Sequence, residues 1–312
     1  MYRGRFAPSP SGPLHFGSLV AAVGSYLEAK TQSAVDNSEH NSEWLVRIED
    51  LDAPRVVAGA ADGILRSLEA FGMAWDGPVM FQSTRTEAYH AALEQLRARG
   101  VLYGCACTRR EIADSSLRGM DGAVYPGTCR EGLPPGRSAR ATRLRTQGAK
   151  VSFNDNIQGA ITQDVEREAG DFVVARADGV IAYQLAVVVD DAAQGITGVV
   201  RGADLLEATP RQILLQRLLR LPTPRYTHLP VAVNAAGEKL SKQTHARAVN
   251  PDRPAPQLVS VLRFLGQTTP LALTRAPVSE VWDWAIANWR LMQTSGRQAC
   301  APPGESAGPG SR

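Results

Sequence analysis

Apolar residues in the first hundred positions follow two different patterns. Residues 2–7, YRGRFA, and 44–50, WLVRIED, form short runs that predict strands. Residues 17–30, GSLVAAVGSYLEAK, place apolar side chains three and four positions apart and predict a helix. The stretches near 58–71 and 84–99 have the same spacing and predict two more helices. Because strands alternate with helices, we expect a parallel α/β sheet with right-handed crossovers.

This alternation stops in two places. Residues 31–43 are polar and have no periodicity, so they predict a surface loop. Residues 101–145 contain cysteines, glycines and prolines but few long apolar runs. That change of composition predicts a small module inserted into the sheet domain.

Strand-like runs return in the second half of the chain. Residues 171–176, DFVVAR, 181–191, IAYQLAVVVDD, and 196–202, ITGVVRG, predict three further strands. A helix is predicted over 209–221, with Thr209 as its N-cap. The sheet predicted for the first half should therefore continue here.

The end of the chain divides into a helical part and a polar tail. Residues 254–292 predict helices, and Trp282, Trp284 and Trp289 are expected in their core. Residues 296–312 are rich in glycine, proline and serine, which is typical of a disordered tail.

Length and charge leave the class of partner open. The chain has 312 residues, of which 44% are hydrophobic, and its 34 basic and 31 acidic residues give a net charge of +3. It contains no apolar run of about 18 residues and no apolar leader, so we expect a cytoplasmic protein without a transmembrane helix. The arginines of 137–145 form either a basic patch for nucleic acid or an ordinary solvated surface.

Residues 5–18, RFAPSPSGPLHFGS, carry the first candidate site. A strand runs into a proline-rich turn, which brings His15 and Gly17 to the start of the next predicted helix. The free N–H groups and positive dipole end of a helix start form a site for an anion such as phosphate. The alternative is an ordinary proline-rich loop with a helix cap.

Residues 237–243, GEKLSKQ, carry a second candidate site. Lys239 and Lys242 lie three positions apart on a glycine-led loop and can reach one polyphosphate from the same side. A solvated lysine loop is the alternative reading of this segment alone.

Together these two segments resemble the paired ATP-binding motifs of class I aminoacyl-tRNA synthetases. Residues 5–12, RFAPSPSG, 47–52, RIEDLD, and 199–212, VVRGADLLEATPRQ, are similar to the glutamyl and glutaminyl branch of that class. The chain departs from the general motifs at Ser18, where a second histidine would stand, and also at Leu240 and Gln243.

The resemblance implies a fold and a set of domains. We expect an α/β, Rossmann-like class I synthetase catalytic domain with an inserted zinc-binding module and a short helical C-terminal part. The expected divisions are residues 1–100 and 146–245 for the two catalytic halves, 101–145 for the module, 246–295 for the helical part and 296–312 for the tail.

The resemblance also implies site residues. Glutamate carries two carboxylates and one ammonium group, so its site needs cations, an anion and neutral hydrogen-bonding groups. The implied glutamate contacts are Arg5, Ser9, Glu49, Tyr183 and Arg201. ATP, with Mg²⁺, is expected on Pro8, His15, Gly17, Ser18 and Lys242, and the catalytic residues are expected to be His15, Lys239 and Lys242. The alternatives are a strand-end salt bridge for Arg47 and Glu49 and a core position for Tyr183.

Three cysteines suggest a metal site. Cys105, Cys107 and Cys129 suit a structural tetrahedral zinc ion, whose fourth ligand would be Tyr125 or a water molecule. Free buried cysteines are the alternative. The same arrangement, with tyrosine as the ligand, is a feature of the glutamyl-queuosine tRNA(Asp) synthetases, the shorter relatives within this branch.

The expected activity follows from that resemblance. Few residues follow Lys242, so we expect no separate anticodon-reading domain. The chain would activate L-glutamate with ATP and transfer it to queuosine in the anticodon loop of tRNA(Asp), as a monomer. A conventional glutamyl-tRNA synthetase that lacks its anticodon domain and a non-catalytic nucleotide- or tRNA-binding paralogue are the alternatives.

Overall fold

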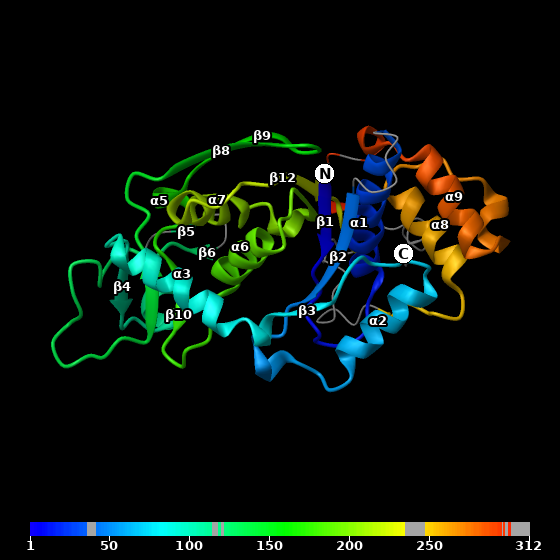
Figure 1. The fold of residues 1–312 in the computed structure, drawn as a ribbon. Coiled ribbons are helices and arrows are strands. Elements are labelled where there is room, and N and C mark those ends of the chain that lie inside the picture. The colour runs from blue at the N-terminus through cyan, green and yellow to red at the C-terminus, as the bar shows by residue number, and fades with distance from the viewer. Residues whose placement is uncertain are drawn as a thin grey trace, which may run out of the picture.

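Two groups of parallel strands lie side by side at the centre of the molecule (Figure 1). The computed structural model describes residues 1–35, 42–113, 118–119, 122–234, 247–294, 296 and 299–300. The first group has the order β1-β2-β3, formed by Tyr2–Phe6, Ser42–Ile48 and Met80–Phe81, all parallel. In the second group β11 (Gly198–Gly202) pairs with β12 (Arg225–Leu229), also in parallel.

The two groups meet at the outer edge of β1. The Thr197 N–H donates to the Arg3 carbonyl oxygen at 2.9 Å, and the Arg3 N–H donates to Thr197 Oγ1 at 2.9 Å. On its other side β12 pairs in parallel with β8 (Lys150–Asp155), which forms an antiparallel hairpin with β9 (Gly159–Asp164). The sheet predicted from the alternating pattern is therefore present and spans both halves of the chain.

Helices cover these strands and extend the molecule at one end. Trp44, Leu27 and Leu262 are fully buried or nearly so in a core that joins α1 to the C-terminal helices. Figure 1 shows α8 and α9 packed beside α1, far from β4 and β10. The longer helices are α1 (Phe16–Val35), α2 (Ala60–Ala70), α3 (Thr86–Ala98), α6 (Tyr183–Ala193), α7 (Thr209–Leu219), α8 (Pro254–Phe264) and α9 (Val278–Asn288).

The region around the cysteines forms a separate small sheet. Its antiparallel strands have the order β10-β7-β4, formed by Phe172–Arg176, Ala141–Leu144 and Leu102–Cys105. The remaining short elements are α4 (Arg109–Ala113), α5 (Val165–Glu168), β5 (Arg118–Gly119), β6 (Gly122–Ala123), β13 (Val231–Ala232) and β14 (Ala299–Cys300). In the described part of the chain, no helix is both long and apolar enough to cross a membrane.

One predicted strand is wrong. Of residues 181–191, Ile181 forms an isolated bridge with Ala175, and from Tyr183 the segment is helix α6 instead. A short apolar run cannot be assigned to strand or helix by periodicity alone, and the valines at 187–189 favour a strand locally. Tertiary packing decides the outcome, because Leu185 and Ala186 are fully buried in the core that α6 shares with α3 and α7.

Three boundaries also differ from the predictions. The loop expected over 31–43 is shorter, because α1 continues to Val35 and β2 begins at Ser42. Within the expected tail, Ala299 and Cys300 form β14, which pairs with β13. Thr209 is the first residue of α7 and not its N-cap, and its hydroxyl donates to the Leu205 carbonyl oxygen at 3.0 Å.

The tryptophans join the C-terminal helices to the rest of the fold. Trp282 and Trp289 are buried as predicted, whereas Trp284 is only partly buried. Trp282 Nε1 donates to the Phe71 carbonyl oxygen at 2.8 Å, and Trp289 Nε1 donates to Glu28 Oε1 at 2.6 Å. Burial raises the pKa of Glu28, which the Trp289 hydrogen bond opposes.

Replacing Trp289 should therefore destabilise the protein. In Trp289→Phe an aromatic ring is kept, although a smaller one, but Glu28 loses its buried donor, so we expect the free energy of unfolding to fall by about 1–3 kcal/mol. Urea denaturation measures the change. Trp284→Phe is the matched control and should cost less than about 1 kcal/mol. Equal losses in the two variants would contradict this role for the Trp289–Glu28 hydrogen bond.

Candidate active site

One cavity of about 560 Å³ opens where β1, β2 and β11 end. Ligands of open α/β sheets bind at the carboxyl ends of the parallel strands, where neighbouring loops diverge. All the predicted glutamate- and ATP-site residues that the structure describes line this cavity: Arg5, Pro8, Ser9, His15, Gly17, Ser18, Glu49, Tyr183 and Arg201. Lys239 and Lys242 lie outside the described residues.

A buried ion network forms one wall of the cavity. Arg5 Nε lies 3.1 Å from Asp191 Oδ1, and Arg47 Nη1 lies 2.8 Å from the same oxygen. Arg47 also donates to Gln194 Oε1 at 2.7 Å and lies 3.3 Å from Glu49 Oε1. The salt bridge considered for Arg47 and Glu49 is therefore present, and Glu49 faces the cavity as well.

Sequence reasoning missed Asp191. It lies on α6, which was predicted as a strand, so its position next to Arg5 and Arg47 could not be inferred. One signal was available: Asp190 and Asp191 follow directly on an apolar run, where a carboxylate is rarely buried without a partner. Asp190 is fully buried too, and it accepts hydrogen bonds from Tyr89 Oη at 2.7 Å and Gln82 Nε2 at 2.9 Å.

Charge within the network is unevenly balanced. Burial opposes the ionised form of Asp191, but the Arg5 and Arg47 guanidiniums outweigh it and lower the pKa of Asp191. For Glu49 burial dominates and raises the pKa, although Arg47 and Arg5 oppose it. A cationic group bound in the cavity beside Glu49 would therefore stabilise its carboxylate.

Arg201 is the second buried cation of the cavity, with an exposed fraction of 5%. Its Nη2 donates to Thr209 Oγ1 and to Gln212 Oε1, both at 2.8 Å, and its Nε donates to His228 Nε2 at 3.1 Å. Nη1 is buried and has no hydrogen-bond partner among the described residues. A buried guanidinium that has one nitrogen without a hydrogen-bond acceptor suits an anionic ligand.

His15 directly precedes helix α1 and lines the cavity. Its Nδ1 accepts a hydrogen bond from the Ser18 N–H at 3.3 Å, so the imidazole contributes to capping the helix. Its backbone forms a bridge with Ala248, and the Val249 N–H donates to the Leu14 carbonyl oxygen at 2.9 Å. The strand–turn–helix arrangement predicted for residues 5–18 is confirmed, and it includes a helix cap.

The three cysteines form a compact cluster at the end of β4. The Sγ atoms of the three residues, Cys105, Cys107 and Cys129, all lie within 4.8 Å of one another. They are close enough to hold one metal ion. The Cys107 and Cys129 sulfurs are 3.7 Å apart, and the Tyr125 hydroxyl lies 3.4 Å from Cys105 Sγ and 3.7 Å from Cys107 Sγ. A tetrahedron with metal–sulfur bonds of 2.3 Å requires sulfurs about 3.8 Å apart, so the cluster fits such an ion.

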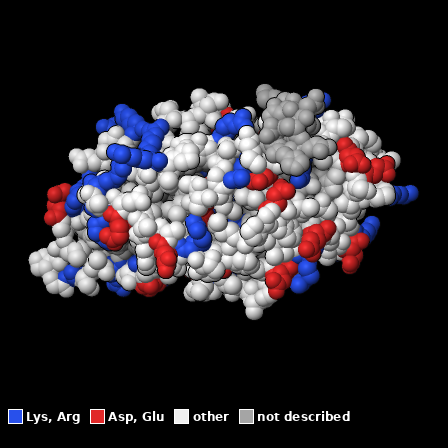
Figure 2. Space-filling model, viewed as in Figure 1, with Lys and Arg blue, Asp and Glu red and all other residues white. Residues whose placement is uncertain are grey.

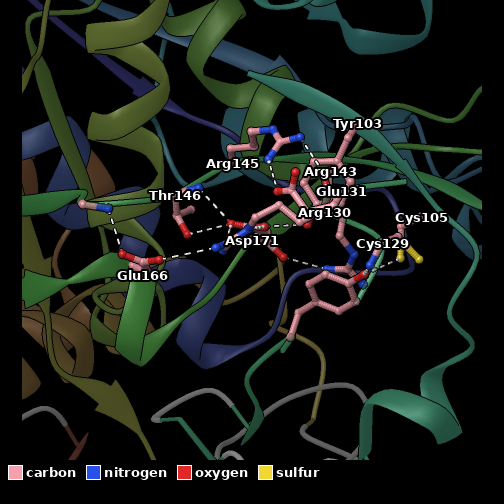
Figure 3. Close-up of polar contacts among 12 residues, drawn as sticks. Tyr103, Cys105, Cys129, Arg130, Glu131, Arg143, Arg145, Thr146, Glu166 and Asp171 are labelled. Carbon is pink, nitrogen blue, oxygen red and sulfur yellow. Dashed lines mark hydrogen bonds and ion pairs between the residues drawn. The ribbon is translucent and has the colours of Figure 1, made fainter. Parts of the chain in front are cut away.

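A polar network supports this cluster (Figure 3). Arg143 is buried, and its guanidinium lies 3.8 Å from the centre of the Tyr125 ring. Asp171, just before β10, accepts two hydrogen bonds from Arg130, at 2.8 and 2.9 Å, and one from the Thr146 N–H at 2.8 Å. Burial raises the pKa of the Cys105 thiol, but its hydrogen-bonding contacts with Tyr125 and Arg143 outweigh burial and lower the pKa. Sequence reasoning predicted the cluster but not Arg143 and Asp171.

The arginine-rich segment 137–145 is largely engaged within the protein. Arg143 is buried, Arg137 Nη1 lies 2.8 Å from Glu111 Oε1, and Arg145 Nη1 lies 3.4 Å from Glu131 Oε1. Figure 2 shows Lys and Arg side chains gathered at another place, over the region of β8, α5 and α7. The exposed basic residues of those elements include Lys150, Arg167 and Arg217.

Known proteins resemble this chain over nearly its whole length. The family of class I tRNA synthetases (E and Q), catalytic domain, matches residues 1–270. A protein named glutamyl-Q tRNA(Asp) synthetase from Dechloromonas aromatica is 62% identical over 290 residues, covering 92% of this chain and 94% of that protein. A protein of the same name from Aromatoleum aromaticum is 57% identical over 303 residues, covering 97% of this chain and 93% of that protein.

A solved structure has the same fold. The glutamate tRNA ligase of Elizabethkingia meningosepticum, crystallised with its amino acid, superposes with a TM-score of 0.74 at 24% sequence identity. The match covers 95% of this chain and 66% of that chain. The α/β catalytic architecture expected from the sequence is thereby confirmed.

The buried ion network predicts how stability depends on pH. The pKa of Asp191 is lowered in the folded protein, so its contribution is fully present above its unfolded value of about 3.9 and is lost as the pH falls through the folded value. We expect Asp191→Asn to reduce the free energy of unfolding at pH 7 by about 3–5 kcal/mol. The difference from wild type should narrow towards pH 3 in chemical denaturation experiments.

Asp178→Asn is the control for that measurement. Asp178 also forms an ion pair, with Arg176 at 2.6 Å, but both side chains are 51% exposed. An exposed pair contributes at most about 1 kcal/mol, so this variant should be close to wild type at every pH. A difference for Asp191→Asn that stays constant between pH 7 and pH 3 would show that the network does not act through its charge.

Proposed function

The chain belongs to the family of class I tRNA synthetases (E and Q), and on that premise we propose that it activates L-glutamate with ATP and transfers it to queuosine in tRNA(Asp). The observation that carries the first step is the cavity in which two buried arginines and one carboxylate meet. The acceptor is supported by relatives named glutamyl-Q tRNA(Asp) synthetase, which match 92–97% of this chain in the two cases above.

Glutamate would bind between the opposite charges of the cavity. Arg201 Nη1 is buried without a partner among the described residues, and Asp191 holds Arg5 in the lining of the same cavity, so each guanidinium can meet a carboxylate of the substrate. Glu49 would accept the α-ammonium group, which would also offset the cost of burying its own charge. Ser9 and Tyr183 line the same cavity and would add neutral hydrogen bonds.

ATP would bind at the start of α1. Pro8, His15, Gly17 and Ser18 line the cavity there, where the helix start favours phosphate oxygens. Both flanks of the segment that carries Lys239 and Lys242 adjoin this place, because Val231 lines the cavity and Ala248 pairs with His15. This supports a role for the two lysines on the polyphosphate, together with Mg²⁺.

The proposed reaction has two steps. A carboxylate oxygen of glutamate attacks the α-phosphorus of ATP in line with the leaving pyrophosphate and forms glutamyl-adenylate. A hydroxyl of the acceptor nucleoside then attacks the activated carbonyl carbon and displaces AMP. The protein would contribute positioning and charge neutralisation, because the buried arginines compensate the charge that accumulates on phosphate and carboxylate oxygens.

The metal at the cysteine cluster is proposed to be zinc, with Tyr125 as its fourth ligand. Three thiolates suit zinc, and the Tyr125 hydroxyl lies near the position that a fourth tetrahedral ligand would occupy. The Cys129 N–H donates to that oxygen at 2.8 Å, which would stabilise a phenolate. The ion would be structural, since none of the four side chains lines the large cavity.

ATP, glutamate and tRNA would meet in the cytoplasm, and we propose that the protein acts there as a monomer. The exposed basic residues over β8, α5 and α7 offer a surface for the phosphate backbone of the tRNA.

Transfer assays test the proposed acceptor. We expect ATP–pyrophosphate exchange that requires glutamate but no tRNA, and labelling of tRNA(Asp) by radioactive glutamate only when the tRNA carries queuosine. Removal of the 3′-terminal adenosine from the tRNA should leave labelling of the base unchanged. Labelling of tRNA(Glu) at its 3′ end would instead identify a conventional glutamyl-tRNA synthetase, and ATP binding without exchange would indicate a non-catalytic paralogue.

Metal analysis tests the proposed zinc site. We expect about one zinc ion per chain after purification, and its loss from Cys129→Ser. Cys300→Ser is the matched control, because Cys300 lies on β14 outside the cluster, and it should keep the metal. If Tyr125 is the fourth ligand, Tyr125→Phe should weaken zinc retention against a chelator at least about tenfold. Equal metal content in Cys129→Ser and Cys300→Ser would exclude the site.

A further inference from the structure

A buried acid–histidine pair lies directly behind Arg201. His228 on β12 and Asp155 on β8 are 0% and 1% exposed, and His228 Nδ1 lies 2.6 Å from Asp155 Oδ2. Neither residue lines the cavity. They therefore cannot touch a substrate there, and any role in the proposed reaction must pass through a residue that does.

The geometry fixes which nitrogen of His228 carries the proton. Asp155 Oδ1 accepts hydrogen bonds from the backbone N–H groups of Ile157 at 3.0 Å and Gln158 at 2.9 Å, which holds the carboxylate in place. Asp155 Oδ2 then faces Nδ1, so that nitrogen must donate. The other nitrogen, Nε2, presents its lone pair to the Nε–H of Arg201 at 3.1 Å.

The neutral form of His228 is the one that suits this contact. Burial lowers the pKa of His228, Asp155 opposes the shift, and the Arg201 charge adds to it. A neutral imidazole can accept the Arg201 hydrogen bond, whereas an imidazolium would place an N–H against it.

Two sets of partners therefore fix Arg201. His228 accepts a hydrogen bond from Nε, and Thr209 and Gln212 accept from Nη2. Only Nη1 is therefore left without a partner among the described residues. If His228 could not accept this hydrogen bond, the Nε–H of Arg201 would also be buried without a partner. The guanidinium would then rotate towards another acceptor. The position of Nη1 depends on this contact.

We propose that His228 and Asp155 are positioning residues, which orient Arg201 so that its Nη1 meets a carboxylate of glutamate. The inference rests on the proposed function, because it concerns how that site binds its amino acid. Loss of the orientation should weaken glutamate binding and leave ATP binding at the start of α1 unchanged, since among the described residues no hydrogen-bond partner of His228 belongs to that turn.

A matched pair of variants at one position tests the proposal. In His228→Gln the amide oxygen can reach the place of Nε2 and accept from Arg201. In His228→Asn the shorter amide reaches only the place of Nδ1. It therefore keeps the hydrogen bond to Asp155 and loses the one from Arg201. We expect KM for glutamate in ATP–pyrophosphate exchange to rise at least about tenfold in His228→Asn, with KM for ATP changed less than about twofold. His228→Gln should recover most of the loss.

A second variant tests the tautomer and does not depend on the folding of the first two. In Asp155→Asn the amide oxygen should stay on the backbone N–H groups of Ile157 and Gln158, so the NH₂ group faces His228. Nδ1 would then accept and Nε2 would carry the proton towards Arg201. KM for glutamate should rise as in His228→Asn, and circular dichroism would report whether each variant is folded.

The outcomes separate this inference from the proposed function. If wild type shows no glutamate-dependent exchange, the proposed function fails. If wild type is active but His228→Asn and Asp155→Asn keep the wild-type KM for glutamate, only the positioning role fails. Equal effects of the Asn and Gln variants, or a parallel rise in KM for ATP, would also overturn it, because a general loss of structure would act in that way.

Discussion

The buried carboxylate of Asp191 is the contact on which the arrangement of the cavity depends. It lies on α6, in the second half of the chain, and accepts from Arg5 on β1 and Arg47 on β2, which belong to the first half. Buried guanidiniums without an anion would be strongly destabilising, so the strands and the helix must come together for any of the three charges to be tolerated. The same contact fixes Arg5 at the edge of the cavity.

Each buried arginine that lines the cavity has hydrogen-bond partners behind it. Arg5 is backed by Asp191, and Arg201 is backed by His228, Thr209 and Gln212. These partners use up some donors of each guanidinium and leave others for a ligand. Such preorganisation reduces the conformational entropy that binding would otherwise cost, because long arginine side chains are ordered before the ligand arrives.

The cysteine cluster is supported in a similar way. Arg143 lies over the Tyr125 ring, and Asp171 ties Arg130 and Thr146 to the start of β10. Gly170, next to Asp171, has a φ of +69°, and a Cβ there would lie 3.0 Å from the Tyr125 carbonyl oxygen. Only glycine allows the backbone to approach so closely, so the position of Tyr125 is set by β10 as much as by its own loop.

Sequence patterns alone were enough to predict the alternation of strands and helices, the strand–turn–helix of residues 5–18 and the cysteine cluster. These features depend on local spacing: apolar periodicity, a proline-rich turn before a helix, and cysteines a few residues apart. The arginines and Glu49 were identified through a family resemblance, and the structure brings them to one cavity. Their roles in binding glutamate stay predictions.

The buried partners of these residues became apparent only from the folded chain. Asp191 was hidden because 181–191 is apolar enough for strand or helix, and burial against α3 and α7 made it a helix. His228 and Asp155 lie 73 residues apart and meet only because β12 pairs with β8. Local sequence carries no information on such pairs, since their energy comes from shared burial between distant segments, which exists only once the chain has folded.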